Sequence, residues 1–499
     1  EVKELVQVAT LCCDAQQNIE CNISHEVGKQ FVSLLLFLKI WMLAYFLSRH
    51  LCVGTILALY IDRIQNLQRK GDEMIKLAVI ADDLTGANDT ALQFAKRNIR
   101  SSVKIDLVNA SSCDTEEVVV ADSDSRDLDA ATAYAKVRDI CLRMQSLHPA
   151  HVFKKIDSTL RGNIGAEIRA AADVFQPELV IIAPAYPRIR RTTVGGHHLM
   201  DGMPLELTEI ANAPKTPVKD SCIPAILARQ AEGISLAVLD YQIVHTGAAA
   251  IAAEIARLRA EGAHWIISDI VEERNFVDLM EALRPCGNIL WVGSAGLADH
   301  LPSFYGWEGA ALRAAAQRAG SIIVCAGSVS HTTQLQVQRL KECADVAEMP
   351  LDVERILTDD AAAEHYESKL NDLLHARRDV LITSAQTDAD VRQAVAAGRA
   401  HGLTGKEVSE RIAQLFADVL GRTNLNEVAG LVLTGGDTAV HICRALGVHS
   451  IDILREIEPG VPLGILRGQG AASVFVVTKA GAFGEVETFV RAVHTIRNL

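Results

Sequence analysis

The chain has 499 residues, of which 49% are hydrophobic and 22% charged, which is typical of a soluble α/β protein and too long for a single core. A formal net charge of −13, with no run of lysines or arginines, argues against a nucleic-acid-binding protein. The cysteines form no CxxC pair and no zinc-type spacing, so we expect reduced thiols, as in a cytoplasmic protein.

Residues 1–73 differ in character from the rest of the chain. Their apolar runs, 31–38, 40–47 and 51–61, are each shorter than the ~20 residues that span a bilayer, and joining the first two would bury Lys39. Purine-rich codons, as in a ribosome-binding site, can encode the five residues before Met74. We therefore expect residues 1–73 to be upstream sequence translated from a misplaced start, with a membrane-associated extension as the alternative.

A buried strand followed by two acids opens the part of the chain that we expect to carry function. Ile75–Ala81 is mostly apolar, and Asp82 and Asp83 follow it directly. Apolar residues at helical spacing begin after Gly86. This order places both carboxylates at the carboxyl edge of a sheet, where open α/β folds bind ligands. The alternative is that one of them only caps the helix.

Strands and helices then alternate up to residue 183. The pattern predicts strands at 103–108, 118–121, 151–156 and 179–183, and helices at 130–144 and 164–175. Polar residues follow the strands repeatedly. This alternation indicates a mainly parallel sheet with a ligand site along one edge.

The polar clusters after these strands mix cations with acids. The cations are Arg126, Lys154, Lys155 and Arg161, and the acids are Asp82, Asp83 and Asp157. An arginine fork matches a carboxylate, and acids without a metal-ligand set suit sugar hydroxyls or general-base work. The combination suits a small polyhydroxy acid, and a web of surface ion pairs is the alternative.

Residues 188–202 predict a glycine-punctuated loop or hairpin that includes Gly196, His197 and His198. Adjacent histidines point apart and no third ligand is evident, so we expect a substrate-lining or structural role and no metal. Residues 204–222 predict a polar excursion over the surface. Strands at 235–239, 265–268 and 289–292 follow, and residues 306–320 predict a linker.

A second α/β unit begins at Ser321. Strands are predicted at 322–326, 380–383, 431–433 and 474–478, with a helix from Val440. Glycines and hydroxyls follow three of these strands, an arrangement that presents backbone N–H groups to phosphate. The chain lacks a GxxxxGK[ST] loop and a Rossmann glycine motif before a helix, so a P-loop or Rossmann nucleotide site is not expected.

Six motifs together resemble the four-carbon acid-sugar kinase family. They are Ala-Asp-Asp-Leu-Thr-Gly-Ala-Asn-Asp (81–89), Lys-Lys-Ile-Asp-Ser-Thr-Leu-Arg-Gly-Asn (154–163), Arg-Thr-Thr-Val-Gly-Gly (191–196), Gly-Ser-Val-Ser-His-Thr-Thr (327–333), Thr-Gly-Gly-Asp-Thr-Ala (434–439) and Lys-Ala-Gly-Ala-Phe-Gly (479–484). The resemblance implies two α/β domains with mainly parallel sheets, an acid-sugar-binding domain at 74–305 and a nucleotide-binding domain at 321–499, with the active site in the cleft between them. It also implies ATP, Mg²⁺ and phosphorylation of the terminal hydroxyl of a tetronate.

The resemblance assigns site residues motif by motif. Asp82, Asp83 and Arg161 are the catalytic candidates, with Asp82 or Asp83 orienting or deprotonating the hydroxyl. Substrate contacts fall on Asp82, Arg126, Lys154, Lys155, Ile156, Asp157, Ser158, Gly196 and His197. ATP contacts fall on Ser328, Gly435, Gly436, Asp437, Thr438 and Gly481, and no metal-ligand set is assigned. Val329, Ala480 and Ala482 depart from the usual family residues, which makes the last loop the least secure assignment.

The segment 191–198 is similar to the family members that act on threonate, so we expect D-threonate as the preferred substrate. The Val194-Gly195 pair replaces the Tyr-Gln of the 3-oxo-tetronate members and would leave room for a tetrahedral, hydroxyl-bearing carbon. D-erythronate and 3-oxo-tetronate are the alternatives, and a non-catalytic sensor of acid sugar and nucleotide is a rival class. We expect no stable membrane association of residues 74–499. The sequence leaves open whether the protein forms a homo-oligomer.

Overall fold

The computed structural model describes residues 75–107, 116–213, 215–309, 318–468 and 473–499. All of these lie in one compact unit, Glu73–Leu499. The expectations for residues 1–73, and for residue 108, lie outside the described residues. The strand predicted at 103–108 is instead formed by Ser101–Lys104, and residues 105–107 are not part of a strand. In these ranges no helix has both the length and the apolar character needed to cross a bilayer.

The N-terminal half alternates strands with helices. Its strands are β1 (Leu77–Ala81), β2 (Ser101–Lys104), β3 (Val118–Asp122), β4 (His151–Lys155), β5 (Leu179–Ala183), β6 (Arg191–Val194), β7 (His197–Met200), β8 (Met203–Pro204), β9 (Leu236–Leu239), β10 (Trp265–Ser268) and β11 (Ile289–Gly293). Its helices are α4 (Leu84–Ala95), α5 (Ala130–Gln145), α6 (Ile164–Phe175), α7 (Ile223–Gln230), α8 (Tyr241–Val244), α9 (Ala248–Ala260), α10 (Glu273–Leu283) and α11 (Ala295–Tyr305). Short 3₁₀ turns lie at Pro187–Ile189, Leu205–Leu207 and Glu209–Asn212.

The C-terminal half repeats the alternation and ends in a hairpin and a last strand. Its strands are β12 (Ser321–Ala326), β13 (Val346–Pro350), β14 (Asp379–Thr383), β15 (Val428–Thr434), β16 (Val448–Glu458), β17 (Val461–Gly468) and β18 (Phe475–Lys479). Its helices are α12 (His331–Cys343), α13 (Val353–Thr358), α14 (Ala362–His375), α15 (Asp388–Ala400), α16 (Gly405–Gly421), α17 (Gly436–Ala445) and α18 (Thr488–Arg497). A 3₁₀ turn covers Leu425–Glu427.

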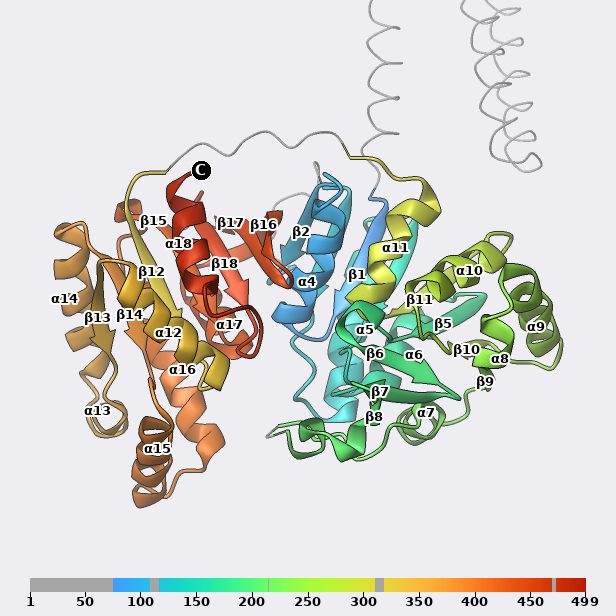
Figure 1. Cartoon of the computed structure of the whole chain (residues 1–499), viewed down its shortest axis with the longest axis horizontal. Coiled ribbons are helices and arrows are strands. Elements are labelled where there is room, and N and C mark those ends of the chain that lie inside the picture. Colours follow the sequence, from blue (N-terminus) through green and yellow to red (C-terminus); the bar gives the residue numbers. More distant parts are fainter. Residues whose placement is uncertain (1–74, 108–115, 214, 310–317, 469–472) are drawn as a thin grey trace, which may run out of the picture. The chain divides into compact units, whose positions relative to one another are not determined.

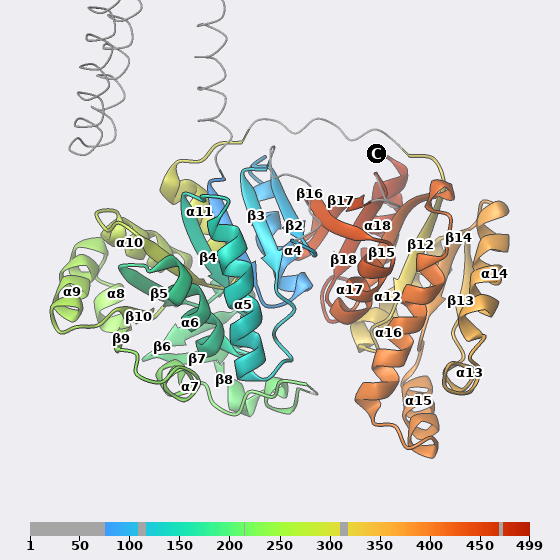
Figure 2. The ribbon, with the colours of Figure 1, turned by 180° about the vertical axis from the view of Figure 1, so that it is seen from behind.

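Helices cover both faces of the strands, as Figures 1 and 2 show from opposite sides. In the N-terminal half, Leu77 and Val79 of β1 pack with α4 and α11, whereas Ile80 packs with α5 and α6. In the C-terminal half, Val324 of β12 packs with α12 and α18, whereas Cys325 packs with α16 and α17. Strands buried on both faces explain why their sequences are nearly continuous apolar runs.

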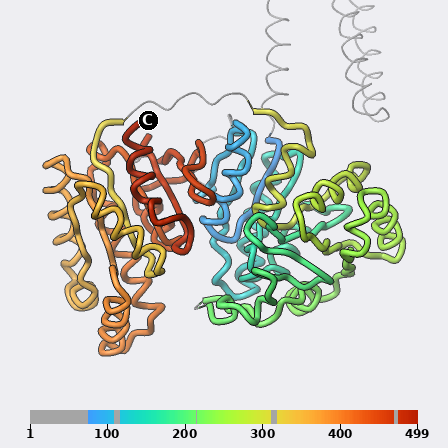
Figure 3. The backbone as a smooth tube through the Cα atoms, viewed as in Figure 1, coloured from blue at the N-terminus to red at the C-terminus, as the bar shows by residue number. Residues whose placement is uncertain are grey.

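One strand pairing, which the sequence did not predict, joins the strands of the two halves. Three of the described strands, β6, β7 and β8, form a small separate sheet, and the others form one 15-stranded sheet in the order β13-β14-β12-β15-β18-β17-β16-β2-β3-β1-β4-β11-β5-β10-β9. Its two halves are joined by β16 and β2, which run antiparallel with Ser450 opposite Lys104 and Ile453 opposite Ser101. Figure 3 shows the red hairpin of β16 and β17 beside the blue β2 strand. The prediction of mainly parallel α/β architecture is confirmed, and the antiparallel pairing of β16 with β2 makes the strands of the two halves continuous.

Both groups of predicted ligand residues lie where neighbouring parallel strands send their chains to opposite faces. β1 leads into α4 on one face, and its neighbour β4 leads into α6 on the other. β12 leads into α12 on one face, and its neighbour β15 leads into α17 on the other. Such switch points open a crevice at the carboxyl ends of the strands, which is where open α/β sheets bind ligands.

Two differences from the sequence prediction, and one alternative that it left open, concern the candidate site. The helix expected from Val440 begins at Gly436, so the glycine motif forms its first turn. Residues 188–202 form the antiparallel pair β6 and β7, the hairpin alternative. The strands β13, β16 and β17 were not predicted; β16 and β17 pair along most of their length.

Candidate functional site

Asp82, Asp83 and Arg126 form one ion-pair cluster at the carboxyl ends of β1 and β3. Arg126 Nε donates to Asp82 Oδ2 (2.7 Å) and Nη2 donates to Asp82 Oδ1 (3.0 Å), a bidentate pair. Arg126 Nη1 donates to Asp83 Oδ2 (2.6 Å). Asp83 also caps α4, because its Oδ1 accepts from Gly86 N (2.8 Å). Asp83 is therefore both a helix cap and a member of the cluster. The capping role and the role in a polar cluster, which the sequence left as alternatives, are both present.

The two aspartates of this cluster have different protonation tendencies. Burial alone would raise the pKa of Asp82, but Arg126 and the lysines behind it outweigh burial and lower that pKa. Burial raises the pKa of Asp83 in spite of Arg126, and the charge of Asp82 adds to the rise. Asp82 is 4% exposed and Asp83 26%, so the more accessible carboxylate is also the better proton acceptor.

Lys154 and Lys155 are adjacent on β4 and point to opposite sides of the sheet. Lys154 is fully buried, and its Nζ lies 2.8 Å from Glu167 Oε2 on α6. It also donates to Ile80 O (3.2 Å) and Lys155 O (2.7 Å), which uses all three of its donors. This geometry suits support of the loop after β4 rather than direct contact with a ligand.

Lys155 lies at the opposite side, over the first turn of α4. A Cβ placed on Gly86 would be 2.8 Å from Lys155 Nζ, so the ammonium sits against that glycine. Lys155 is 4% exposed. Its charge acts against burial to lower the pKa values of Asp82, Asp83 and Asp89, but within the described ranges no carboxylate forms an ion pair with it. A buried cation at the positive end of a helix is unfavourable unless an anion joins it. Lys155 is therefore the group in this cluster that most needs an anionic ligand.

The loop after β4 is held by its own aspartate. Arg161 Nε donates to Asp157 Oδ2 (2.7 Å) and Nη2 donates to Oδ1 (3.0 Å), while Thr159 Oγ1 donates to the same carboxylate. Burial would raise the pKa of Asp157, but Arg161 and Arg126 hold it well below its usual range. Ile156 is buried, and its N–H donates to Gly293 O (2.9 Å). Arg161 is thus already neutralised by Asp157.

Arg191 and His198 support this loop. The sequence indicates Arg191 only as part of a motif and leaves a substrate-lining or a structural role open for His198. Arg191 Nη1 donates to Ser158 Oγ, and no carboxylate in the described ranges forms an ion pair with Arg191. His198 is buried; its Nε2 lies 3.0 Å from Ser158 O and its Nδ1 lies 3.0 Å from Thr193 Oγ1. Because a carbonyl only accepts, Nε2 carries the proton and Nδ1 accepts from Thr193. Their signal in the sequence was strand alternation, which places 191, 193 and 198 on one side of the hairpin.

We expect stability to fall at mildly acidic pH because of His198. Burial lowers the pKa of His198 from 6.5 to about 4. The unfolded chain therefore takes up this proton near pH 6.5 and the folded chain only near pH 4. The contribution of neutral His198 to the free energy of unfolding is complete above pH 6.5. It is lost as pH falls toward 4, and the loss is about 3 kcal/mol at most. Urea unfolding between pH 4 and 7 should show a weaker pH dependence in His198→Gln than in the wild type. The exposed neighbour His197→Gln is the control and should keep the wild-type slope.

Gly196 and His197 lie at the outer end of the hairpin. Gly196 N donates to Asp269 Oδ1 (2.9 Å), and His197 Nδ1 lies 3.2 Å from Ser221 Oγ. Val194 is 40% exposed, and a Cβ on Gly195 would meet nothing within 4 Å. The Val194-Gly195 pair thus lies in open space, so extra room there gives no physical reason for a substrate preference. The residue of this segment that reaches the ion-pair loop is Arg191.

The predicted nucleotide residues come together from three adjacent strands, β12, β15 and β18. Ser330 Oγ donates to Gly481 O (2.6 Å), which ties the loop after β12 to the loop after β18. A Cβ on Gly481 would overlap Ser328 Oγ, and a Cβ on Gly327 would overlap Thr438 Oγ1. Gly435 has φ +95°, a conformation that favours glycine. Glycine is thus required where these loops approach each other most closely.

The first turn of α17 supplies unpaired donors at this junction. Gly436, Asp437 and Thr438 are its first three residues, and the N–H groups of a first turn have no partner within the helix. They add to the positive end of the helix dipole. Phosphate binds well to this combination.

The acid cluster and the first turn of α17 lie next to each other. A Cβ on Gly436 would be 3.1 Å from Thr85 Oγ1, the second residue of α4. Lys215 Nζ lies 2.6 Å from Asp437 Oδ2 and 2.9 Å from Asp127 Oδ2. Asn88 of α4 donates through Nδ2 to Thr478 Oγ1 of β18 (2.9 Å). The segment that carries Asp82 and Asp83 therefore adjoins the glycine loops of the C-terminal half.

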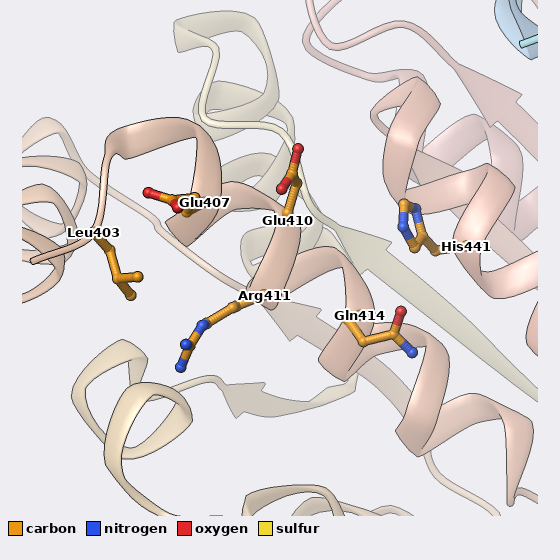
Figure 4. Close-up of a pocket in the computed structure, with 6 residues that line it drawn as sticks. All are labelled: Leu403, Glu407, Glu410, Arg411, Gln414 and His441. Atoms are coloured by element: carbon orange, nitrogen blue, oxygen red, sulfur yellow. The ribbon is translucent and has the colours of Figure 1, made fainter. Parts of the chain in front are cut away.

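Of two hollows in the described part of the chain, one borders the ion-pair cluster and the other is lined by none of the predicted site residues. One, of about 330 Å³, borders Arg126, Gly162 and Lys219. The other, of about 370 Å³, lies between α16 and α17, where the labelled side chains do not converge on one point (Figure 4). In the part of the chain that the structure describes, no group of three His, Cys, Asp or Glu side chains is arranged to hold a metal.

Two family models match the chain, one in each half: a sugar-binding N-terminal domain over residues 77–301 and a nucleotide-binding C-terminal domain over residues 323–489. A D-threonate kinase from Salmonella typhimurium (strain LT2) is 34% identical over 440 residues, 85% of this chain and 99% of that protein. A 3-oxo-tetronate kinase from Pectobacterium atrosepticum is 30% identical over 437 residues, 84% of this chain and 99% of that protein. A crystal structure from Salmonella typhimurium LT2 superposes with a TM-score of 0.73 at 26% identity, covering 84% of this chain and 99% of that one.

Proposed function

The chain belongs to the four-carbon acid-sugar kinase family, as its motifs predicted, and from this premise we propose that it transfers the terminal phosphoryl group of ATP to the 4-hydroxyl of D-threonate. The observation that carries the proposal is the contact between the first turns of α4 and α17. It brings a carboxylate cluster with an unpaired lysine beside a set of loops suited to phosphate. Phosphoryl transfer depends mostly on such positioning and on charge neutralisation.

In the proposed sugar site, cations without a carboxylate partner would hold the carboxylate of the acid. Lys155 and Arg191 meet that description, whereas Arg126 and Arg161 are already paired with Asp82 and Asp157. Asp82, kept ionised by Arg126, would accept hydrogen bonds from substrate hydroxyls. Asp83, the more exposed carboxylate with the raised pKa, would take the proton of the 4-hydroxyl as its oxygen attacks the γ-phosphorus.

In the proposed nucleotide site, the first turn of α17 and the loops at Ser328 and Gly481 would hold the phosphates. Mg²⁺ belongs to the proposal because it is usually bound by substrate phosphates with one or two carboxylates, and Asp437 at 63% exposure fits that donor set. When bound, the ion would neutralise charge on the transferring group. Lys155 and Arg191 would then balance the charge of the substrate carboxylate, and Mg²⁺ would balance part of the charge of the phosphates.

The decisive test is ADP formation by the purified full chain with ATP, Mg²⁺ and a panel of tetronates. We expect rapid ADP formation with D-threonate and only slow background hydrolysis without an acid sugar. Binding of both ligands without turnover would favour the non-catalytic sensor instead. A kinase and a non-catalytic sensor would give the same binding isotherms, so turnover is the measurement that separates the two hypotheses.

The preference among acid sugars is a separate expectation. We expect kcat/KM to be highest for D-threonate, then D-erythronate, then 3-oxo-tetronate. Paired donors that recognise a hydroxyl discriminate by several kcal/mol when its absence leaves them buried and unpaired. The three kcat/KM values should be compared under one set of conditions. A clear preference for the ketone would contradict D-threonate as the substrate while leaving the kinase activity intact.

A further inference from the structure

A buried lysine lies at the junction of the three glycine loops, and the proposed reaction has given it no role. Lys479 ends β18 and is 2% exposed. Its Nζ donates to Thr333 Oγ1 (3.3 Å), Thr434 Oγ1 (3.2 Å) and Gly481 O (3.1 Å). These groups belong to the first turn of α12, the end of β15 and the loop after β18. One ammonium therefore binds all three loops.

All three acceptors of Lys479 are neutral. Within the described ranges no carboxylate forms an ion pair with it, and the Phe489 ring of α18 lies 5.6 Å from its Nζ. Glu458 on β16 is the acid that acts on it, but Glu458 Oε2 is paired with Arg491 (2.8 Å). His331, the first residue of α12, is exposed. The protein thus buries a cation and leaves its counter-charge to be supplied from outside.

The protonation state of Lys479 would respond to a bound anion. Burial lowers the pKa of Lys479 to about 7, against the opposing effect of Glu458. A phosphate bound at the loops would favour the charged form and raise that pKa again. The hydrogen bonds from Lys479 to the three loops would be strongest when its amino group is protonated, since hydrogen bonds from a charged donor are roughly twice as strong as neutral ones.

We propose that Lys479 is the positioning residue of the nucleotide site, and that its side chain takes up a proton and ties the three loops together when the phosphates of a nucleotide bind. This inference rests on the proposed function, because it requires that the loops bind a nucleotide. Lys479 acts through Gly481, Thr333 and Thr434 rather than through contact with the reacting atoms. The readout that separates this role from a merely structural one is the proton count of binding.

The test is calorimetric titration of the full chain with ADP and Mg²⁺ at pH 6, 7 and 8, in buffers of different ionisation enthalpy. We expect the wild type to take up little proton at pH 6, about half a proton at pH 7 and more at pH 8, because the free lysine loses its proton over this range. Phosphate groups that lose a proton on binding would give release instead. A wild type that binds ADP without uptake overturns the inference, whereas a wild type that does not bind ADP overturns the proposed function.

Three variants identify the group that titrates. Lys479→Met should bind ADP about tenfold more weakly and take up no proton. Lys479→Arg keeps a fixed charge, so it should also show no uptake but should bind more tightly than Lys479→Met. Lys341→Met removes a partly exposed lysine of α12 that pairs with Glu348, and should keep the wild-type proton count. Unchanged uptake in Lys479→Met overturns the inference, and the pH series of the wild type tests it even if that variant does not fold.

Discussion

Lys155→Met should lower kcat/KM for the acid sugar by roughly 10²–10³-fold while leaving thermal stability unchanged or raised. Lys155 Nζ lies over Gly86 at the positive end of α4, with no carboxylate paired to it in the described ranges. Methionine fills a similar volume without the charge, so the free protein loses an unfavourable burial and the bound state loses its counter-ion. Steady-state kinetics with the acid sugar varied, together with a thermal melt, measures both effects.

The neighbouring lysine provides a matched control with the opposite expected outcome. Lys154→Met would leave Glu167 buried without its partner, and breaking a buried ion pair from one side costs about 3–5 kcal/mol. We therefore expect a large fall in melting temperature in Lys154→Met. If Lys155→Met is destabilised to the same degree, or keeps full activity, Lys155 does not serve the substrate.

Gly481→Ala should raise the KM for ATP about 5- to 150-fold with little change in the KM for the acid sugar. The added Cβ would overlap Ser328 Oγ and lie 2.8 Å from Ser328 Cβ, so the loop after β12 must move. Overpacking of this kind costs about 1–3 kcal/mol. Because Ser330 and Thr333 both donate to Gly481 O, the movement would spread to the start of α12.

Gly405→Ala is the control for this substitution. Gly405 is the first residue of α16 in the same half, and a Cβ there meets nothing within 4 Å. It should leave both KM values unchanged, since alanine also favours a helix. An unaltered KM for ATP in Gly481→Ala would place the nucleotide elsewhere, with the 370 Å³ hollow between α16 and α17 as the next site to examine.

The sequence predicted best the elements that have a regular apolar pattern. The helix Ile164–Phe175 has the predicted bounds because its buried residues recur at helical spacing, and the strands Leu179–Ala183 and Trp265–Ser268 have theirs because they are short, nearly continuous apolar runs. The strand β16 was missed because its apolar pattern is irregular. Its pairing with β17 shifts register at three places, which breaks the alternation of apolar and polar residues, and its other partner is β2.

The different surroundings of neighbouring predicted residues depended on contacts that no local pattern contains. Lys154 and Lys155 are adjacent and of the same type in the sequence. They differ in the structure because Lys154 forms an ion pair with Glu167 on α6. His197 and His198 are likewise neighbours, and the carbonyl of Ser158 selects His198. The burial of Lys479 depends on loops that follow β12 and β15. Motifs therefore predicted which loops come together, whereas the contacts that distinguish neighbouring residues within those loops needed the tertiary structure.

The β2–β16 pairing also constrains how the chain can be made. Ser101–Lys104 leaves the ribosome about 350 residues before its partner Ser450–Ile453 does, which at 5–20 residues per second is a wait of roughly 20–70 s. During that time β2 is an unpaired edge, and an open edge is a template for pairing with other chains. The nascent N-terminal half thus has a built-in aggregation hazard that only completion of translation removes. Fragments cut at the sequence boundary between the halves would keep that hazard permanently.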